Sequence, residues 1–107
     1  MSNIWEVKEG VRYVLPTEKK AFSITTTPVG STPTNISVKA YDESVDEDVT
    51  TTVYPTNSPT ADGDVIMLSL FRGDLATEGH KYRIHITFTD SSSNVWTRVL
   101  KVVVPQL

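Results

Sequence analysis

The residues best suited to general acid–base chemistry in this chain are two histidines, His80 and His85. They are five positions apart, and neither belongs to an HxH or HExxH pattern, the spacings that place two imidazoles on one metal ion. The chain also has no GxSxG motif and no cysteine, so the usual serine and thiol nucleophiles are missing. A glycosidase-like pair of carboxylates stays open as an alternative, although carboxylates are common in loops of every kind. We therefore predict two surface histidines and no enzymatic activity.

Carboxylates are the second group that could do chemistry, because a loop rich in oxygen ligands can hold Ca²⁺. They crowd into two loops, as Asp42, Glu43, Asp46, Glu47 and Asp48, and as Asp62 and Asp64 on either side of a glycine. The EF-hand pattern is absent, and charged loops also protect strands against edge pairing with other chains. A solvated loop is the simpler interpretation and calcium the alternative. We predict no metal and no cofactor.

The tripeptide Arg72-Gly73-Asp74 spells an integrin-type motif. A three-residue match is expected often by chance, and this one follows a β-like run where the chain must turn. We interpret it as part of a connection.

Length and charge bound the class of protein. The chain of 107 residues suits one domain with one core, which we place at residues 1–107. The net charge is -3, the sequence pI is near 5.2, and the ten Lys and Arg are scattered, which argues against a nucleic-acid partner. No apolar run approaches the roughly 20 residues needed to span a bilayer. The start "MSNIWEVKEG" lacks the layout of a signal peptide, so we expect no membrane partner and a cytoplasmic origin.

The elements that must position these side chains are β-strands. Thr, Val, Ile and Tyr are abundant, and most prolines and glycines fall between the β-like runs. Strands are expected within residues 9–16 and at 20–27, 34–42, 49–55, 65–71, 81–89 and 95–104, with an arm or first strand at 4–8 and one helical turn within 72–80. Seven to eight short strands without a longer helix predict an all-β fold, a single antiparallel β-sandwich.

The clearest alternation lies at residues 81–89, where one parity is apolar: Tyr82, Ile84, Ile86 and Phe88. Period 2 predicts a sheet with one face on a core and the other, including His85, in water. In 95–104 Arg98 interrupts the apolar parity, which predicts a bulge near Arg98–Lys101. The run 65–71 is apolar at nearly every position, which predicts a strand covered on both faces.

The stretch "LATEGHKYRIHITFTDSSSNVWTRVLKV" resembles the C-terminal half of immunoglobulin-like and fibronectin-type sandwiches. Leu75, Gly79 and Tyr82 are similar to the Leu…Gly…Tyr pattern before the penultimate strand, and "TDSSSN" is similar to the last hairpin turn. The resemblance implies an immunoglobulin-like β-sandwich with a tyrosine corner, in which the Tyr82 hydroxyl bonds backward to the preceding connection. The Cys…Trp…Cys signature of antibody domains is absent.

A wider layout, residues 36–102, resembles small structural proteins of tailed bacteriophages and prophages. The matching residues are Val38–Glu43, Asp48–Thr50, Val65–Leu70, Gly73, Leu75, Gly79, Tyr82 and Asp90–Asn94. The hairpin turn lacks the glycine of that pattern and has "SSSN" instead. The resemblance implies a structural or assembly protein of the virion, in the head, the head–tail joint or the tail, located in the virion or the host bacterial cytoplasm. The alternative is a carbohydrate- or protein-binding module of a bacterial surface protein or enzyme.

Aromatic and apolar residues near the N-terminus are the best candidates for an interaction site. Ile4, Trp5 and Val7 lie in a short segment that could fold onto its own domain or dock on a neighbour. An exposed strand edge could also accept a partner strand. We predict protein partners, including other virion proteins, with a homo-oligomer as one form of such contacts.

Overall fold

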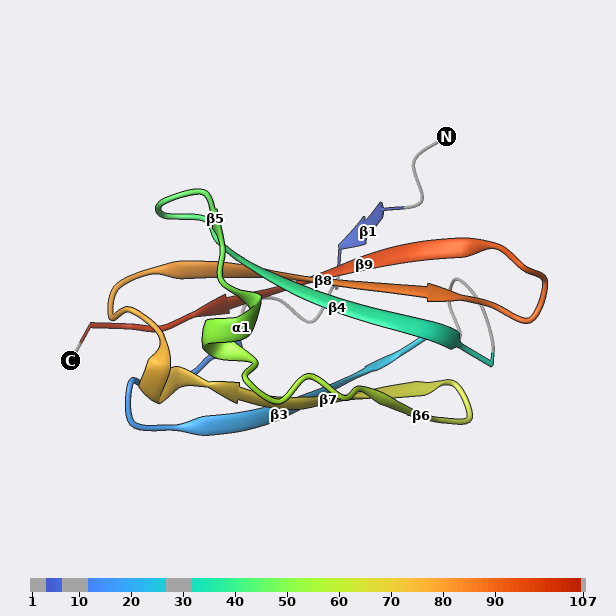
Figure 1. Ribbon diagram of the computed structural model, residues 1–107, viewed down its shortest axis with the longest axis horizontal. Coiled ribbons are helices and arrows are strands. Elements are labelled where there is room, and N and C mark those ends of the chain that lie inside the picture. The colour runs from blue at the N-terminus through green and yellow to red at the C-terminus, as the bar shows by residue number, and fades with distance from the viewer. Residues whose placement is uncertain (1–3, 7–11, 27–31, 107) are drawn as a thin grey trace.

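The computed structural model describes residues 4–6, 12–26 and 32–106, which form two β-sheets packed face to face (Figure 1). The larger sheet has the order β1 (Ile4–Glu6), β9 (Val95–Val103), β8 (Lys81–Thr89), β4 (Thr34–Asp42) and β5 (Glu47–Asp48), and β2 (Arg12–Tyr13) also pairs with β9. The smaller sheet has the order β3 (Lys19–Thr25), β7 (Val65–Arg72) and β6 (Thr60–Asp62). A short α1 (Thr50–Val53) and a 3-10 turn, η1 (Gly73–Leu75), complete the described elements. The prediction of an all-β fold is confirmed.

The β8–β9 hairpin keeps one register from the Lys81–Val103 pair to the Thr89–Val95 pair, so the predicted bulge near Arg98–Lys101 is wrong. Arg98 stays on the inner face, opposite Ile86, and is buried. Its guanidinium reaches across to the other sheet and donates to the carbonyl of Thr25 at the end of β3. A buried cation is tolerated when it is hydrogen-bonded. Arg98 can therefore occupy an inward-facing position among apolar residues, and β9 does not need a bulge to turn it outward.

Two strands depart from the antiparallel prediction. β1 and β2 both run parallel to β9, with Ile4 opposite Thr97 and Arg12 opposite Val102. A parallel pair needs a long connection rather than a tight hairpin. Here almost the whole chain separates the two partners, so the first and last described strands can run in the same direction.

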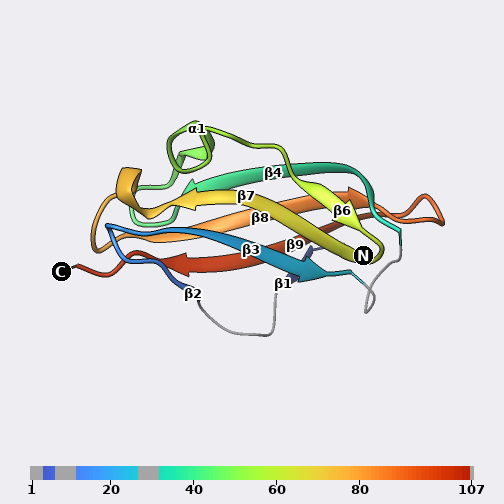
Figure 2. The same ribbon diagram turned by 90° about the horizontal axis from the view of Figure 1, so that it is seen from below.

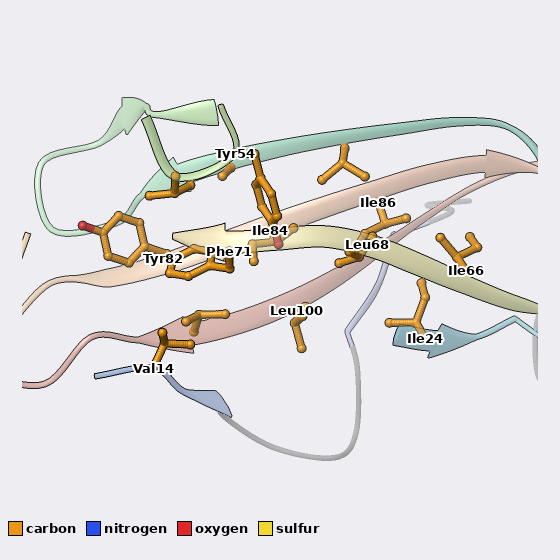
Figure 3. Packing of buried hydrophobic residues seen from close by; sticks show 14 of the residues in the cluster. Val14, Ile24, Tyr54, Ile66, Leu68, Phe71, Tyr82, Ile84, Ile86 and Leu100 are labelled. Atoms are coloured by element: carbon orange, nitrogen blue, oxygen red, sulfur yellow. The ribbon is translucent and has the colours of Figure 1, made fainter. Parts of the chain in front are cut away.

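The core lies between the two sheets (Figure 3). The strict alternation of β8 is confirmed, because Tyr82, Ile84, Ile86 and Phe88 are all buried. Tyr54, Phe71 and Tyr82 form a row of edge-to-face rings with centroids 5.7 Å apart in each pair. Such pairs contribute about 0.5–1.5 kcal/mol each beyond the burial of their area.

β7 does not have the two covered faces that its composition predicts. Ile66, Leu68 and Phe71 point into the core, whereas Met67 and Leu70 are 42% and 49% exposed on the outer face. The register with β3 shifts by one residue between the Ala21–Leu70 and Ser23–Met67 pairs. This bulge reverses the parity within β7 and so keeps Phe71 inside. The outer face of the smaller sheet is therefore apolar at its centre.

The predicted strand at 49–55 is also wrong, because Thr50–Val53 form α1 on the crossing from β5 to β6. The Thr50 hydroxyl accepts from the Ala40 backbone N–H at 2.9 Å, in the position where a paired strand would offer its carbonyl. The turn that follows buries Val53 and Tyr54 against the core. Burial of these two side chains overrides the β propensity of the local Val and Thr residues.

Two connections between the sheets meet at one end of the molecule (Figure 2). One leads from β2 to β3 through Val14–Glu18, and the other leads from β7 through η1 to β8. Gly73 is buried between them, and a Cβ there would lie 2.5 Å from the Leu15 carbonyl oxygen. The helical turn predicted within 72–80 is confirmed as η1.

Candidate functional site

The N-terminal candidates are only partly within the described residues. Ile4 and Trp5 belong to β1, whose backbone pairs with Thr97–Val99 of the same chain, and Val7 lies outside the described residues. The backbone of the first two thus joins its own sheet. A partner contact through Ile4, Trp5 and Val7 stays a prediction.

His80 is less isolated than the sequence suggests, because its Nδ1 lies 2.7 Å from Oδ2 of Asp42. Asp42 ends β4 and is only 3% exposed, so it is not part of a solvated acidic loop. Its other oxygen accepts from the Ser44 N–H, and the Ser44 hydroxyl accepts from the Lys81 N–H. Ser44 therefore contacts the carboxylate and the β8 backbone instead of the imidazole. Sequence spacing could not reveal this pair, because the two residues are adjacent only through the β4–β8 pairing.

The Tyr82 hydroxyl confirms the predicted tyrosine corner. It accepts from the Thr77 N–H at 2.7 Å, five residues back in the connection that precedes β8. The ring is buried, and burial together with the nearby Asp42 carboxylate raises the pKa of Tyr82. The phenol is neutral at physiological pH and fixes the connection to the core. Its role is therefore structural.

His85 lies, as predicted, on the outer face of the larger sheet, where it lines a shallow hollow of about 330 Å³. The hollow is lined by hydroxyl, amine and ring groups from three strands, namely Ser37, Lys39, Tyr41, His85, Thr87 and Thr97. The Tyr41 and His85 rings meet edge to face at 5.0 Å, and the Arg83 guanidinium lies 5.9 Å from the Tyr41 ring centroid. Burial and then Arg83 lower the pKa of His85, which keeps the imidazole neutral at pH 7. The hollow offers hydrogen-bonding groups and an aromatic ring, without a nucleophile poised beside a base.

The carboxylates of the two acidic loops are separated by their local contacts. Glu43 lies 3.5 Å from the Arg83 guanidinium, Asp48 accepts from the N–H and hydroxyl of Thr50, and Asp64 accepts from the Thr32 N–H. The hydrogen bonds from Thr50 lower the pKa of Asp48. Over residues 4–6, 12–26 and 32–106, no three His, Asp or Glu side chains gather in a geometry for a metal ion. These contacts give Glu43, Asp48 and Asp64 structural partners.

The Arg-Gly-Asp tripeptide folds back on itself. Arg72 donates to both carboxylate oxygens of Asp74, from Nε at 2.9 Å and from Nη2 at 2.8 Å, and this pairing lowers the pKa of Asp74. Gly73, which separates the two charged residues in the sequence, is buried. The segment is a connection, as the sequence predicts, in which the two charged groups bind each other.

Asp90 organises the β8–β9 turn and holds the adjacent aromatic residue. Its Oδ1 accepts from the N–H groups of Ser92 and Asn94, and its Oδ2 accepts from the Trp96 indole N–H at 2.8 Å. These hydrogen bonds, that from Trp96 first, lower the pKa of Asp90. Ser93 adopts φ 66°, the backbone region where such turns commonly use glycine. A carboxylate thus stabilises the turn that lacks the glycine of the phage-like pattern.

The outer face of the smaller sheet carries two large apolar side chains that are exposed. Met67 and Leu70 stand at its centre beside the small side chains of Ala21 and Ser23 on β3. Exposed single apolar residues are ordinary, but large ones grouped on a flat sheet indicate a contact surface. Sequence reasoning missed this face because it interpreted the apolar run of β7 as buried on both sides.

Among the described residues, no helix is long and apolar enough to cross a bilayer. No protein-family model matches the sequence, and no curated protein shows significant similarity to it.

Proposed function

We propose that this chain is an immunoglobulin-like structural protein that does no chemistry and works through protein–protein contacts in a phage or prophage virion. The observation that carries the contact function is the apolar centre of the smaller sheet's outer face, formed by Met67 and Leu70. The virion setting rests on the sequence resemblance.

The strand order supports the immunoglobulin-like assignment within the all-β class. In that topology the second, fourth and fifth strands form one sheet, and the third, sixth and seventh form the core of the other. β3, β6 and β7 correspond to the first set, and β4, β8 and β9 to the second. The tyrosine corner at Tyr82, at the start of the penultimate strand, is a second and independent feature of that architecture.

The composition of purified particles tests the virion assignment. Particles produced by a strain that encodes this chain should contain it at a fixed copy number by quantitative mass spectrometry. A chain that is expressed in the infected or induced cell but is absent from washed particles would contradict the assignment.

A carbohydrate-binding module is the second candidate, and the hollow on the larger sheet favours it. Hydroxyls of Ser37, Thr87 and Thr97, the Lys39 amine and the Tyr41 ring are the kinds of group that hold a sugar by hydrogen bonds and ring contact. If this candidate is correct, a glycan array gives reproducible binding that Tyr41→Ala abolishes. An array without binding, together with presence in particles, decides for the structural role.

A further inference from the structure

We infer that the outer face of the smaller sheet is a self-association surface, on which a second copy of this chain packs back to back with its strands reversed. This inference rests on the proposed contact function and names the partner of that face. Figure 2 shows β3, β7 and β6 as the layer nearest the viewer, with no described element in front of them.

The side chains on this face are arranged with an apolar centre between two polar ends. Because of the pairing with β7, residues 19, 21, 23 and 25 of β3 share the outer parity with Met67 and Leu70. Ala21 and Ser23 leave the two large side chains standing above a flat surface. Beside Leu70, a hollow of about 260 Å³ is lined by Pro55, Thr56, Ser69, Leu70 and Arg72. An apolar side chain of an opposing sheet can enter this hollow.

The two ends of the face carry opposite charge. Lys19 has the outer parity and is exposed at one end, where Arg72 is paired with Asp74. Lys20 has the opposite parity and is paired with Glu18, so Lys19 supplies the positive charge of this end. Asp62 and Asp64 lie at the opposite end, next to the Thr25–Val65 pair. The ends are six residues apart along β3, about 20 Å at the usual rise of a strand.

This charge distribution selects one way of stacking two copies. If the strands of both copies ran in the same direction, lysine would lie over lysine and aspartate over aspartate. A two-fold axis in the interface, perpendicular to the strands, reverses one copy and brings the basic end of each over the acidic end of the other. Each pair of this kind then occurs twice in the dimer, as two-fold symmetry requires.

The small size of the surface places the contact among weak, transient interfaces. The strands β3, β7 and β6 have seven, eight and three residues. At a spacing of about 4.8 Å they cover a flat area of roughly 250–300 Å², well below the ~800 Å² per partner of a standard stable interface. We therefore expect a weak dimer with a Kd on the order of 10–100 μM. Such a contact forms when many copies are held close together.

Analytical ultracentrifugation of the full chain from about 1 μM to 1 mM tests the inference. The wild type should show a monomer–dimer equilibrium, which Leu70→Lys should weaken by more than tenfold. Lys19→Glu and Asp62→Lys should each weaken it by roughly tenfold, since each changes two cross-interface pairs. The double variant Lys19→Glu/Asp62→Lys restores opposite charges across the interface and should recover most of the lost affinity. Lys39→Glu, the same charge change on the larger sheet, is the matched control and should leave the equilibrium within twofold of wild type.

Several results of the ultracentrifugation series would overturn the inference. They are a wild type that is monomeric at 1 mM, a double variant no better than either single variant, or a control as damaging as Lys19→Glu. Binding of a different protein to this face in place of a second copy would overturn it as well. If the chain is monomeric in solution but present in washed particles, self-association alone is refuted. If the chain forms the dimer but is absent from particles, only the virion assignment is refuted. Circular dichroism of each variant should match the wild type, since every charged site lies on the surface.

Discussion

Hydroxyl groups of two buried tyrosines have opposite environments in this core. The Tyr82 hydroxyl is bonded to the Thr77 backbone, whereas the Tyr54 hydroxyl is buried and has no hydrogen-bond partner among the described residues. Burial alone raises the pKa of Tyr54. The sequence predicted the first role, because the resemblance includes the position of Tyr82. It could not predict the second, since the partners of Tyr54 come from β7 and from the packing of α1.

We expect Tyr82→Phe to lower the free energy of unfolding by about 1–2 kcal/mol, because the Thr77 N–H loses its acceptor in a partly buried site. Tyr54→Phe removes a hydroxyl without a described partner, so stability should be unchanged or rise by up to about 1 kcal/mol. Urea unfolding monitored by tryptophan fluorescence measures both. Equal losses in the two variants would contradict the assignment of the tyrosine corner.

The Asp90 carboxylate should make the hairpin turn sensitive to acid. Its pKa is lowered in the folded state, so its stabilising contribution is fully present above the unfolded value near 4. That contribution is lost as the pH falls through the folded pKa. We expect Asp90→Asn to be less stable than wild type at pH 7, and the difference to shrink below pH 4. A thermal melting series from pH 7 to pH 2.5 measures it, and a gap that is independent of pH would contradict this role.

The strands whose residues alternate strictly were the elements that sequence predicted best. The ranges 34–42 and 81–89 coincide with β4 and β8, because side chains of one parity in each strand are buried in the core. The segments at 49–55 and 65–71 were misjudged for a shared reason. In both, contacts with other strands decide the local geometry. In 49–55 the Thr50 hydroxyl binds the backbone of β4, and in 65–71 the bulge in the pairing with β3 changes which side chains face the core.

The hydrogen bonds of Thr50 should therefore decide whether α1 stays docked. Thr50→Val keeps the size of the side chain but leaves the Ala40 N–H without its acceptor, which should lower stability by about 1–2 kcal/mol. Thr51→Val makes the same change on an exposed neighbour and should alter stability by less than about 0.5 kcal/mol. Thr50→Ser should retain most of the wild-type stability. Chemical denaturation of the three variants in parallel gives the comparison.

At the scale of the whole molecule, the two sheets are tied together where the β2–β3 and β7–β8 connections touch. Gly73 permits that contact, because backbone atoms of Leu15 and Glu18 occupy the space that a side chain would need. The sequence showed a glycine in a turn but gave no indication of this close approach, which joins residues far apart in the chain.

We expect Gly73→Ala to destabilise the fold by about 3 kcal/mol or more, since the obstructing atoms are mainly backbone and cannot move aside. Gly63 is a suitable control, because it has φ 60° and a Cβ added there would meet nothing within 4 Å. Gly63→Asn should cost less than about 1 kcal/mol, as asparagine tolerates that backbone conformation. Calorimetry of both variants tests the difference, and similar melting temperatures would refute the tight packing at this end.

The parallel pairing of β1 and β2 with β9 also has a consequence for biosynthesis. On the ribosome, residues 4–6 and 12–13 emerge before residues 95–103, and their hydrogen bonds can form only after residues 95–103 have been translated. Contacts between such remote segments slow folding, because a large loop must close first. Nascent chains stalled before residue 95 should consequently remain protease-sensitive, and release of the last strand should be the step that confers resistance.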